Sequence, residues 1–186
     1  NGDLALASSR ITAASGARQA ITATGAMNIT QPTVVANLEQ ATALAGRLDF
    51  VGKSINHQGR IDLPTGVVTM TAKGADATDS VTLAAGSHIN TPGFVKRFDD
   101  VAAYAAGGSV TLVSERGDVN INSGALVDVS GTAQSDAGRL TVRAAQGRAN
   151  IEGGSLKGAA GSTSRKGTFT LDTGTVADFS ALNNTL

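Results

Sequence analysis

The stretch from Gly108 to Leu171 contains one short pattern nearly three times. VTLVSERGDVNI at residues 110–121 is followed by LTVRAAQGRANI at residues 140–151, and the first triplet returns as FTL at residues 169–171. The offsets are 140 − 110 = 30, 149 − 119 = 30 and 169 − 140 = 29 residues. A fixed period near thirty residues, built from short strand-like triplets, is typical of a repeat architecture.

Apolar and polar residues alternate within each triplet, so their side chains point to opposite faces of a strand. Stacking the copies would pair equivalent strands in parallel, about 4.8 Å apart. The period therefore predicts an all-β fold, a parallel β-helix (solenoid) of about five to six coils, stabilised between neighbouring coils. Two apolar columns and one outward Thr column are expected: Val110, Leu140 and Phe169; Leu112, Val142 and Leu171; Thr111, Thr141 and Thr170.

The composition agrees with a narrow interior and many turns. Of 186 residues, 41% are apolar but only 3% are aromatic, so the core must consist of Val, Leu, Ile and Ala. The 23 Gly residues and abundant Thr, Ser, Asn and Asp are turn formers. A β-sandwich is the alternative, because it also needs many short strands with frequent turns. It does not predict the thirty-residue self-similarity, and we rank it second.

Charge and cysteine content narrow the function classes. The 15 basic and 15 acidic residues give a net charge of +0 with no block of like charge, which leaves a nucleic-acid face unsupported. The chain has no Cys, which excludes disulfides and thiolate metal sites. No apolar run is long enough to span a bilayer. The chain opens on Asn1 without a signal-peptide pattern, so we interpret residues 1–186 as a single segment of a much larger chain.

Residues 33–46 allow two interpretations. Helical spacing relates Val34, Leu38, Ala41 and Ala45. Two short strands, VVANL and ATALA, with a bend at Glu39-Gln40, are the other interpretation, which we favour because both neighbouring segments are β-like.

Residues 91–107 interrupt the repeats. Thr91-Pro92 is typical of a helix start, and Phe94, Phe98, Val101 and Ala105 would lie on one helical face before Gly107-Gly108. We therefore expect a loop excursion with a short amphipathic helix near residues 91–107. The simpler interpretation of its rings is that they cover one side of the stack. The sharper one is a partner site, whose candidate contact residues are Phe94, Phe98 and Tyr104.

No constellation of residues points to catalysis. His57 and His88 are 31 residues apart and would approach each other on one face, but no third ligand accompanies them, so solvent-exposed turn positions are favoured over a metal pair. The adjacent carboxylates of Asp99-Asp100 would point in different directions. Glu152 with Lys157, or Asp118 with Arg143, could meet as in β-helical polysaccharide-cleaving enzymes, yet nothing singles them out. We expect no enzyme activity, cofactor or metal.

Several segments resemble the filamentous haemagglutinin-like exoproteins. LDFVGKSIN at residues 48–56 and GRIDLPTGVVTM at residues 59–70 are similar to that family's pattern of Ile-x-Asn, Gly-x-Ile and Pro-x-Gly-x-Val between strands. GALVDVSG at residues 124–131 and ADFSALN at residues 177–183 are similar to segments of its large members. The likeness to that family covers most of residues 47–186.

The resemblance implies a right-handed parallel β-helix. It implies a very large parent protein of a Gram-negative bacterium, secreted or surface-exposed, with an outer-membrane transporter as partner in two-partner secretion. The segment would be a non-catalytic structural or adhesive shaft, and its receptor would lie on a host cell, the matrix or another bacterium. An adhesin, a contact-dependent toxin and a haem-acquisition protein share this shaft. The alternative is a carbohydrate-active β-helix enzyme, a polysaccharide lyase or a glycosidase.

Overall fold

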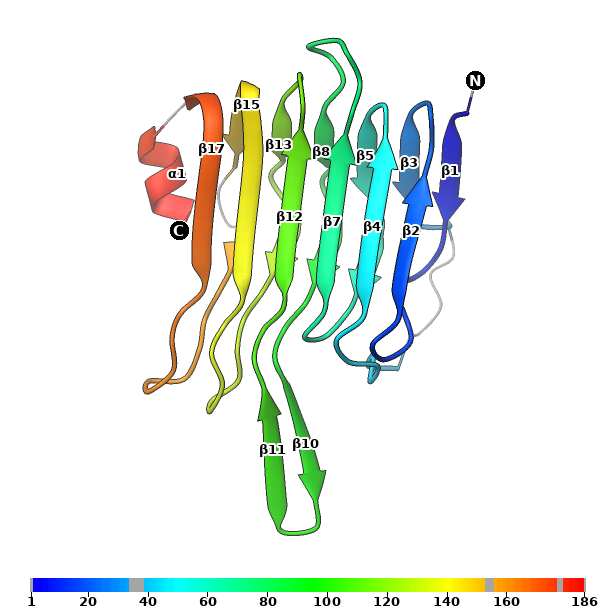
Figure 1. The fold of residues 1–186 in the computed structure, drawn as a ribbon. Coiled ribbons are helices and arrows are strands. Elements are labelled where there is room, and N and C mark those ends of the chain that lie inside the picture. The colour runs from blue at the N-terminus through cyan, green and yellow to red at the C-terminus, as the bar shows by residue number, and fades with distance from the viewer. Residues whose placement is uncertain (1, 34–38, 153–155, 177–178, 186) are drawn as a thin grey trace.

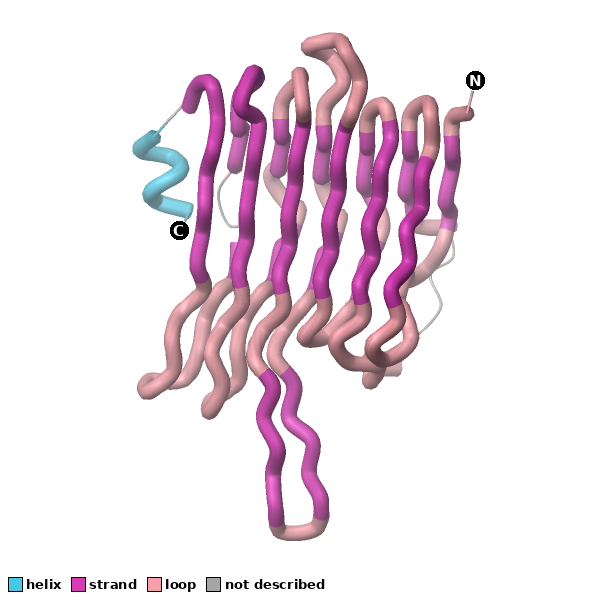
Figure 2. Tube along the Cα trace, viewed as in Figure 1, coloured by secondary structure: helices cyan, strands magenta, loops and turns pink. Residues whose placement is uncertain are grey.

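The computed structural model describes residues 2–33, 39–152, 156–176 and 179–185, and in these ranges the chain is almost entirely β (Figure 1). The only helix in the described residues is α1 (Phe179–Thr185), which follows the last strand. Figure 2 shows that short strands and turns alternate along the rest of the chain. The prediction of an all-β class is confirmed.

The largest sheet has eleven strands, all paired in parallel, and it turns back on itself through one long strand. The N-terminal half of β15 pairs with the first row of strands, and its C-terminal half pairs with β13 of the second row. The first row comprises β2 (Arg18–Thr22), β4 (Arg47–Gly52), β7 (Val67–Ala72), β12 (Ser109–Ser114), β15 (Arg139–Ile151) and β17 (Thr168–Val176). The second row comprises β1 (Leu4–Ala7), β3 (Met27–Thr30), β5 (Ile55–Gln58), β8 (Val81–Leu83) and β13 (Val119–Ile121).

A second parallel sheet of four strands lies elsewhere on the same coils. It consists of β6 (Arg60–Asp62), β9 (His88–Asn90), β14 (Leu126–Asp128) and β16 (Leu156–Lys157). This sheet is the third row of strands. In all three rows, each strand pairs with the equivalent strand of the next coil. The curled parallel sheet is compatible with a β-helix.

The column registers predicted from the sequence are confirmed. Val110 pairs with Leu140, and Leu140 with Phe169. Alternate residues of β4, β7 and β12 are buried, and the buried set is apolar except for Gly52 and Ser114. Because side chains alternate across a strand, one continuous core of Val, Leu, Ile, Ala, Met and one Phe runs through the coils, with Thr111 and Thr141 on the outer face.

A column of glycines precedes the first row of strands. These residues stand immediately before the aligned starts of β4, β7, β12, β15 and β17. A Cβ added to Gly108 would collide with the backbone oxygen of Gly66, and one on Gly138 would collide with the oxygen of Gly108. At Gly66, Gly108 and Gly138 the backbones of successive coils therefore pack too closely for a Cβ. The column consists of Gly46, Gly66, Gly108, Gly138 and Gly167.

One coil is longer than the others because it contains a hairpin. The aligned starts of β7 and β12 are 42 residues apart, whereas those of β12 and β15 are 30 apart. The hairpin of β10 (Phe94–Phe98) and β11 (Val101–Ala105) occupies the twelve residues from Phe94 to Ala105. Removing them leaves a coil of thirty. The hairpin is therefore an insertion into an otherwise ordinary coil.

The predicted helix in residues 91–107 is wrong, since this segment is an antiparallel β-hairpin. The pattern misleads for a physical reason. In the hairpin Phe94 and Phe98 lie on one face because they are four apart, and Val101 joins them because it pairs with Phe98. A helix would place the same three residues on one face, so apolar spacing cannot separate the two folds.

The favoured strands in residues 33–46 are also not found where the chain is described. The first, VVANL, lies outside the described residues. The second, ATALA at residues 41–45, forms neither strand nor helix. Ala45 has a φ of 57°, and its N–H donates to the Thr65 hydroxyl and the Pro64 backbone oxygen. This left-handed conformation interrupts extended backbone.

Candidate functional site

The β10–β11 hairpin projects away from the stacked strands (Figures 1 and 2). Its five cross-strand pairs run from Phe94–Ala105 at the root to Phe98–Val101 at the tip. Asp99 and Asp100 form a two-residue loop, in which Asp99 has a φ of 50°. Asp tolerates this left-handed region better than most residues. The adjacent carboxylates found in the sequence therefore form the tip of the hairpin.

The three predicted contact residues lie on the hairpin but not on one face. Phe94 and Phe98 share a face with Lys96, whose Nζ lies 5.4 Å from the centroid of the Phe98 ring, within cation–π range. Tyr104 points to the opposite face, where it pairs with Val95. The exposed fraction is 55% for Phe98 but only 38% for Tyr104.

Two further exposed apolar residues of the same segment were not among the predicted contact residues. Val101 is 63% exposed beside Phe98, and Val95 is 37% exposed beside Tyr104. Both are β-branched, which favours strands over helices. That propensity was the available signal for a hairpin, and it would have placed exposed apolar side chains on both faces.

Hydrogen bonds attach the root of the hairpin to the following turn. The Ser135 hydroxyl donates to the Ala105 backbone oxygen at 3.0 Å. Gly93 N–H donates to the Ser130 oxygen at 2.7 Å, and Gly107 N–H donates to the Asp136 oxygen at 3.0 Å. The root is thereby held on the stack, and the strands beyond it pair only with each other within the described residues.

A groove of about 540 Å³ begins at this root, and we call it the root groove. Gly107–Ser109 are part of its lining, and the other lining residues lie at or beside the aligned starts of β7, β12, β15 and β17, in four successive coils. Arg165 lies 3.7 Å from the carboxylate of Asp136, which is the only acidic residue lining the groove. Its cations are Arg139, Arg165 and Lys166, so the lining carries a formal excess of positive charge.

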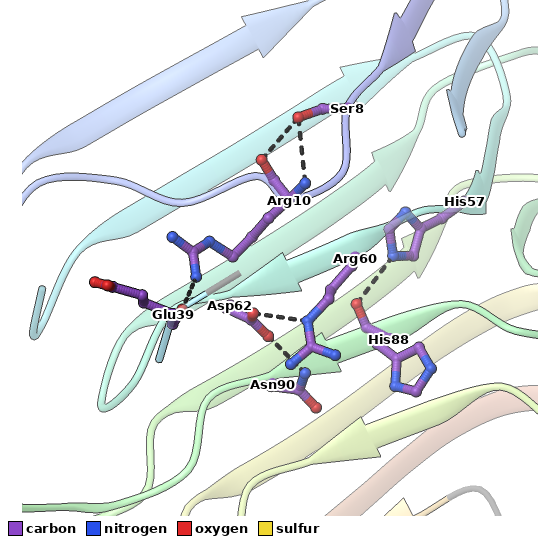
Figure 3. A network of polar contacts seen from close by, with 8 residues as sticks. All are labelled: Ser8, Arg10, Glu39, His57, Arg60, Asp62, His88 and Asn90. Atoms are coloured by element: carbon purple, nitrogen blue, oxygen red, sulfur yellow. Dashed lines mark hydrogen bonds and ion pairs between the residues drawn. The ribbon is translucent and has the colours of Figure 1, made fainter. Parts of the chain in front are cut away.

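The prediction that the histidines are solvent-exposed turn residues is wrong. His57 lies on β5 with its side chain fully buried, and His88 lies on β9 in an intermediate position. The Nε2 atom of His57 is 3.3 Å from the backbone oxygen of His88 (Figure 3). Burial lowers the pKa of His57 to about 4, and burial also lowers the pKa of His88. Alternation along β5 places His57 between Ile29 and Leu83 inside the core.

A polar network lies beside the histidines (Figure 3). Arg60 Nε donates to Asp62 Oδ2 at 2.7 Å, and Asn90 Nδ2 donates to Asp62 Oδ1 at 2.7 Å. Both oxygens of this nearly buried carboxylate are thus hydrogen-bonded, as a buried charge requires. Across the described residues no three His, Asp or Glu side chains are arranged to hold a metal ion.

The two carboxylate–cation combinations considered from the sequence have other partners. Arg143 forms an ion pair with Asp172 at 3.1 Å rather than with Asp118. Asp118 Oδ1 accepts a hydrogen bond from Arg148 N–H at 2.8 Å, and Glu152 Oε2 accepts one from Ser123 N–H at 2.6 Å. These carboxylates hold neighbouring coils and turns together.

Comparisons with known protein families, characterised proteins and solved structures found no match. No helix in the described part of the chain is long and apolar enough to cross a membrane. The hairpin and its root are therefore the candidate functional site.

Proposed function

We propose that this chain is a non-catalytic shaft segment of a right-handed parallel β-helix, belonging to a large secreted or surface-exposed exoprotein of a Gram-negative bacterium. The segment extends the molecule and presents the β10–β11 hairpin for attachment to a host-cell, matrix or bacterial surface receptor. An outer-membrane transporter exports the parent protein. The resemblance to filamentous haemagglutinin-like proteins supports the class of parent, and the parallel coils support the shaft.

One observation carries the attachment role. The twelve hairpin residues are inserted between β7 and β12, yet all six residue pairs between these strands keep their register. Because the coil accepts this insertion without a change of register, stability and contact can depend on different parts of the segment. The stack provides stability, and the projection provides exposed surface for contact, since loops on rigid scaffolds commonly carry binding.

Deletion of residues 94–105 tests the proposal. Gly93 and Ala106 flank the first cross-strand pair, Phe94–Ala105, so they can be joined directly to give a thirty-residue coil. We expect the far-ultraviolet circular dichroism to keep its strand signal and binding to cells or matrix to fall at least about tenfold. A matched variant that replaces Phe98 and Val101 by Ser should reduce binding with the hairpin retained. Unchanged binding by a folded deletion variant would overturn the attachment role of the hairpin.

The alternative, a carbohydrate-active enzyme, makes a different prediction. It requires release of reducing ends or unsaturated sugars from plant or bacterial polysaccharides. We expect no such product above the background of a heat-denatured sample. Turnover that is lost on Asp136→Asn substitution in the root groove would replace the adhesive proposal with an enzymatic one.

A further inference from the structure

The two strands of the hairpin have very different outer edges. Within the described residues each pairs only with the other, so each has one unpaired edge. β10 carries Lys96 and Arg97, whereas β11 has the sequence VAAYA with no charge. Exposed edges are usually protected by charged side chains, especially Lys, or by Pro. The edge of β11 lacks this protection.

We propose that the free edge of β11 pairs, in antiparallel orientation, with β11 of a second copy of this chain. The two hairpins then form one four-stranded sheet about a two-fold axis. This contact deepens the proposed function, because it names a partner for the hairpin: another shaft of the same kind.

The sequence of β11 is self-complementary in one register. With Ala103 on the axis, Val101 of one copy lies opposite Ala105 of the other, and Ala102 lies opposite Tyr104. Every large side chain thus faces a small one, and no charged residues oppose each other on these strands. The contact uses the same patch on both copies, so it closes as a dimer.

The edge of β10 does not offer an equivalent contact. An antiparallel pair of β10 strands centred on Lys96 would place two ammonium groups opposite each other. Arg97 would then lie opposite Val95, without a carboxylate partner on the strand. Like charges directly opposite each other destabilise a sheet, so charge selects β11.

The same register is complementary in charge beyond the strands. It brings the Asp99–Asp100 loop of one copy beside Ala106 at the root of the other copy's hairpin, where Gly107 N–H is already bonded to Asp136 of its own chain. Gly107 lines the root groove, whose three cations outnumber its single carboxylate. Each copy therefore brings two carboxylates to the cationic groove of its partner.

The size of the contact sets its expected strength. Two five-residue strands overlap over a length of about 17 Å. The area that such a short overlap buries is smaller than the roughly 1,200 Å² at the low end of stable interfaces. Association is therefore expected to be weak and reversible in solution. Measurements must extend to about 1 mM protein to detect it.

Sedimentation velocity over that concentration range tests the proposal with matched variants. Ala103→Glu places a carboxylate opposite Lys96 within the hairpin, which favours the hairpin fold, but it places two carboxylates together on the axis. We expect it to raise the dimer Kd at least about tenfold. Val95→Glu adds the same charge to β10 and should leave the Kd within about twofold. A wild-type protein that is monomeric at 1 mM, or equal effects of the two variants, would overturn the proposal.

Cross-linking tests the register. The chain has no Cys, so Ala103→Cys introduces one thiol per copy on the axis. Mild oxidation should give a disulfide-linked dimer at least about tenfold faster than Lys96→Cys, which places the thiol directly across the hairpin on β10. Equal rates would refute β11 pairing. Neither measurement involves a receptor, so a monomer that still attaches to cells refutes this inference alone, whereas a dimer without attachment refutes only the proposed function.

Discussion

The imidazole Nε2 of His57 lies 3.3 Å from the backbone oxygen of His88 on the next coil, inside the core. The other ring nitrogen, Nδ1, is buried without a hydrogen-bond partner among the described residues. A neutral ring satisfies one contact by donating from Nε2, and a charged ring would carry a second, unsatisfied donor. This geometry explains why burial lowers the pKa of His57 to about 4.

The first prediction concerns acid stability. The pKa of His57 falls from 6.5 unfolded to about 4 folded, so the unfolded chain binds more protons between these values. Stability is therefore full above about pH 6.5 and falls as pH decreases toward 4, by up to about 3 kcal/mol from this group. His88 adds to the decline with the same sign, because its pKa is also lowered. Urea unfolding between pH 4 and 7.5 measures the effect.

His57→Leu is the matched variant for that measurement. Leucine resembles the adjacent core residues Ile29 and Leu83, so the variant should fold and lose most of the decline below pH 6.5. His88→Gln should retain most of it. If the His57→Leu protein keeps the wild-type pH profile, another group dominates acid unfolding.

The second prediction concerns hydrogen bonds between coils. Asn120 accepts a bond from Asn150 Nδ2 at 2.7 Å and donates to the Thr82 hydroxyl at 3.3 Å. Asn120→Ala should lower the free energy of unfolding by about 1–2 kcal/mol. The control is Asn56→Ala in the same column, for which the structure shows no side-chain hydrogen bond to a described residue, and it should cost less than about 0.5 kcal/mol. Equal losses in the free energy of unfolding for the two variants would show that these side-chain hydrogen bonds between coils do not stabilise the fold.

The third prediction concerns the glycine column. A Cβ on Gly138 would collide with the backbone oxygen of Gly108, which belongs to the adjacent coil and cannot yield without moving that coil. Gly138→Ala should cost at least about 2 kcal/mol. Gly16 has a φ of 68°, but a Cβ added to it would meet nothing within 4 Å, so Gly16→Ala should cost only about 1 kcal/mol of backbone strain. Thermal unfolding of both variants compares the two costs.

The fourth prediction tests the inward and outward columns. Leu112 is fully buried, whereas its neighbour Thr111 is on the outer face. Leu112→Ala should cost about 2–5 kcal/mol, because a cavity remains in the core. Thr111→Ala should stay within about 0.5 kcal/mol. Similar costs at both positions, measured by chemical denaturation, would contradict the assigned faces.

The repeats carried most of the predictable information. Val110, Leu140 and Phe169 align because equivalent strands stack in register, and this depends only on alternation and period. The hairpin was not predictable from apolar spacing, since Phe94, Phe98 and Val101 share a face in both a helix and a hairpin. Their strand propensity and the Asp99-Asp100 loop were weaker signals than the apparent helix start at Thr91-Pro92.

The sequence predicted which segment holds the candidate site, but it did not predict how the side chains of that segment are arranged. Phe98 and Tyr104 do lie on a projection from the stack, yet on opposite faces of it. The root groove could not be inferred, because Gly107, Asp136, Arg139 and Arg165 meet only when three coils are stacked. Which residues meet between coils depends on the length of each coil. The hairpin insertion had hidden the regular period of the coil between β7 and β12.

The sequence by itself determined the class of fold, the inward and outward columns and the interruption of the repeat near residues 91–107. These follow from local alternation and from similarity between copies, which need no long-range information. Only the tertiary structure decided that His57 is a core residue, that Gly66, Gly108 and Gly138 lie where adjacent coils are in close contact and that the interruption is a hairpin with one uncharged edge. Each of these depends on which coil lies against which, and the chain determines that only when its core is assembled.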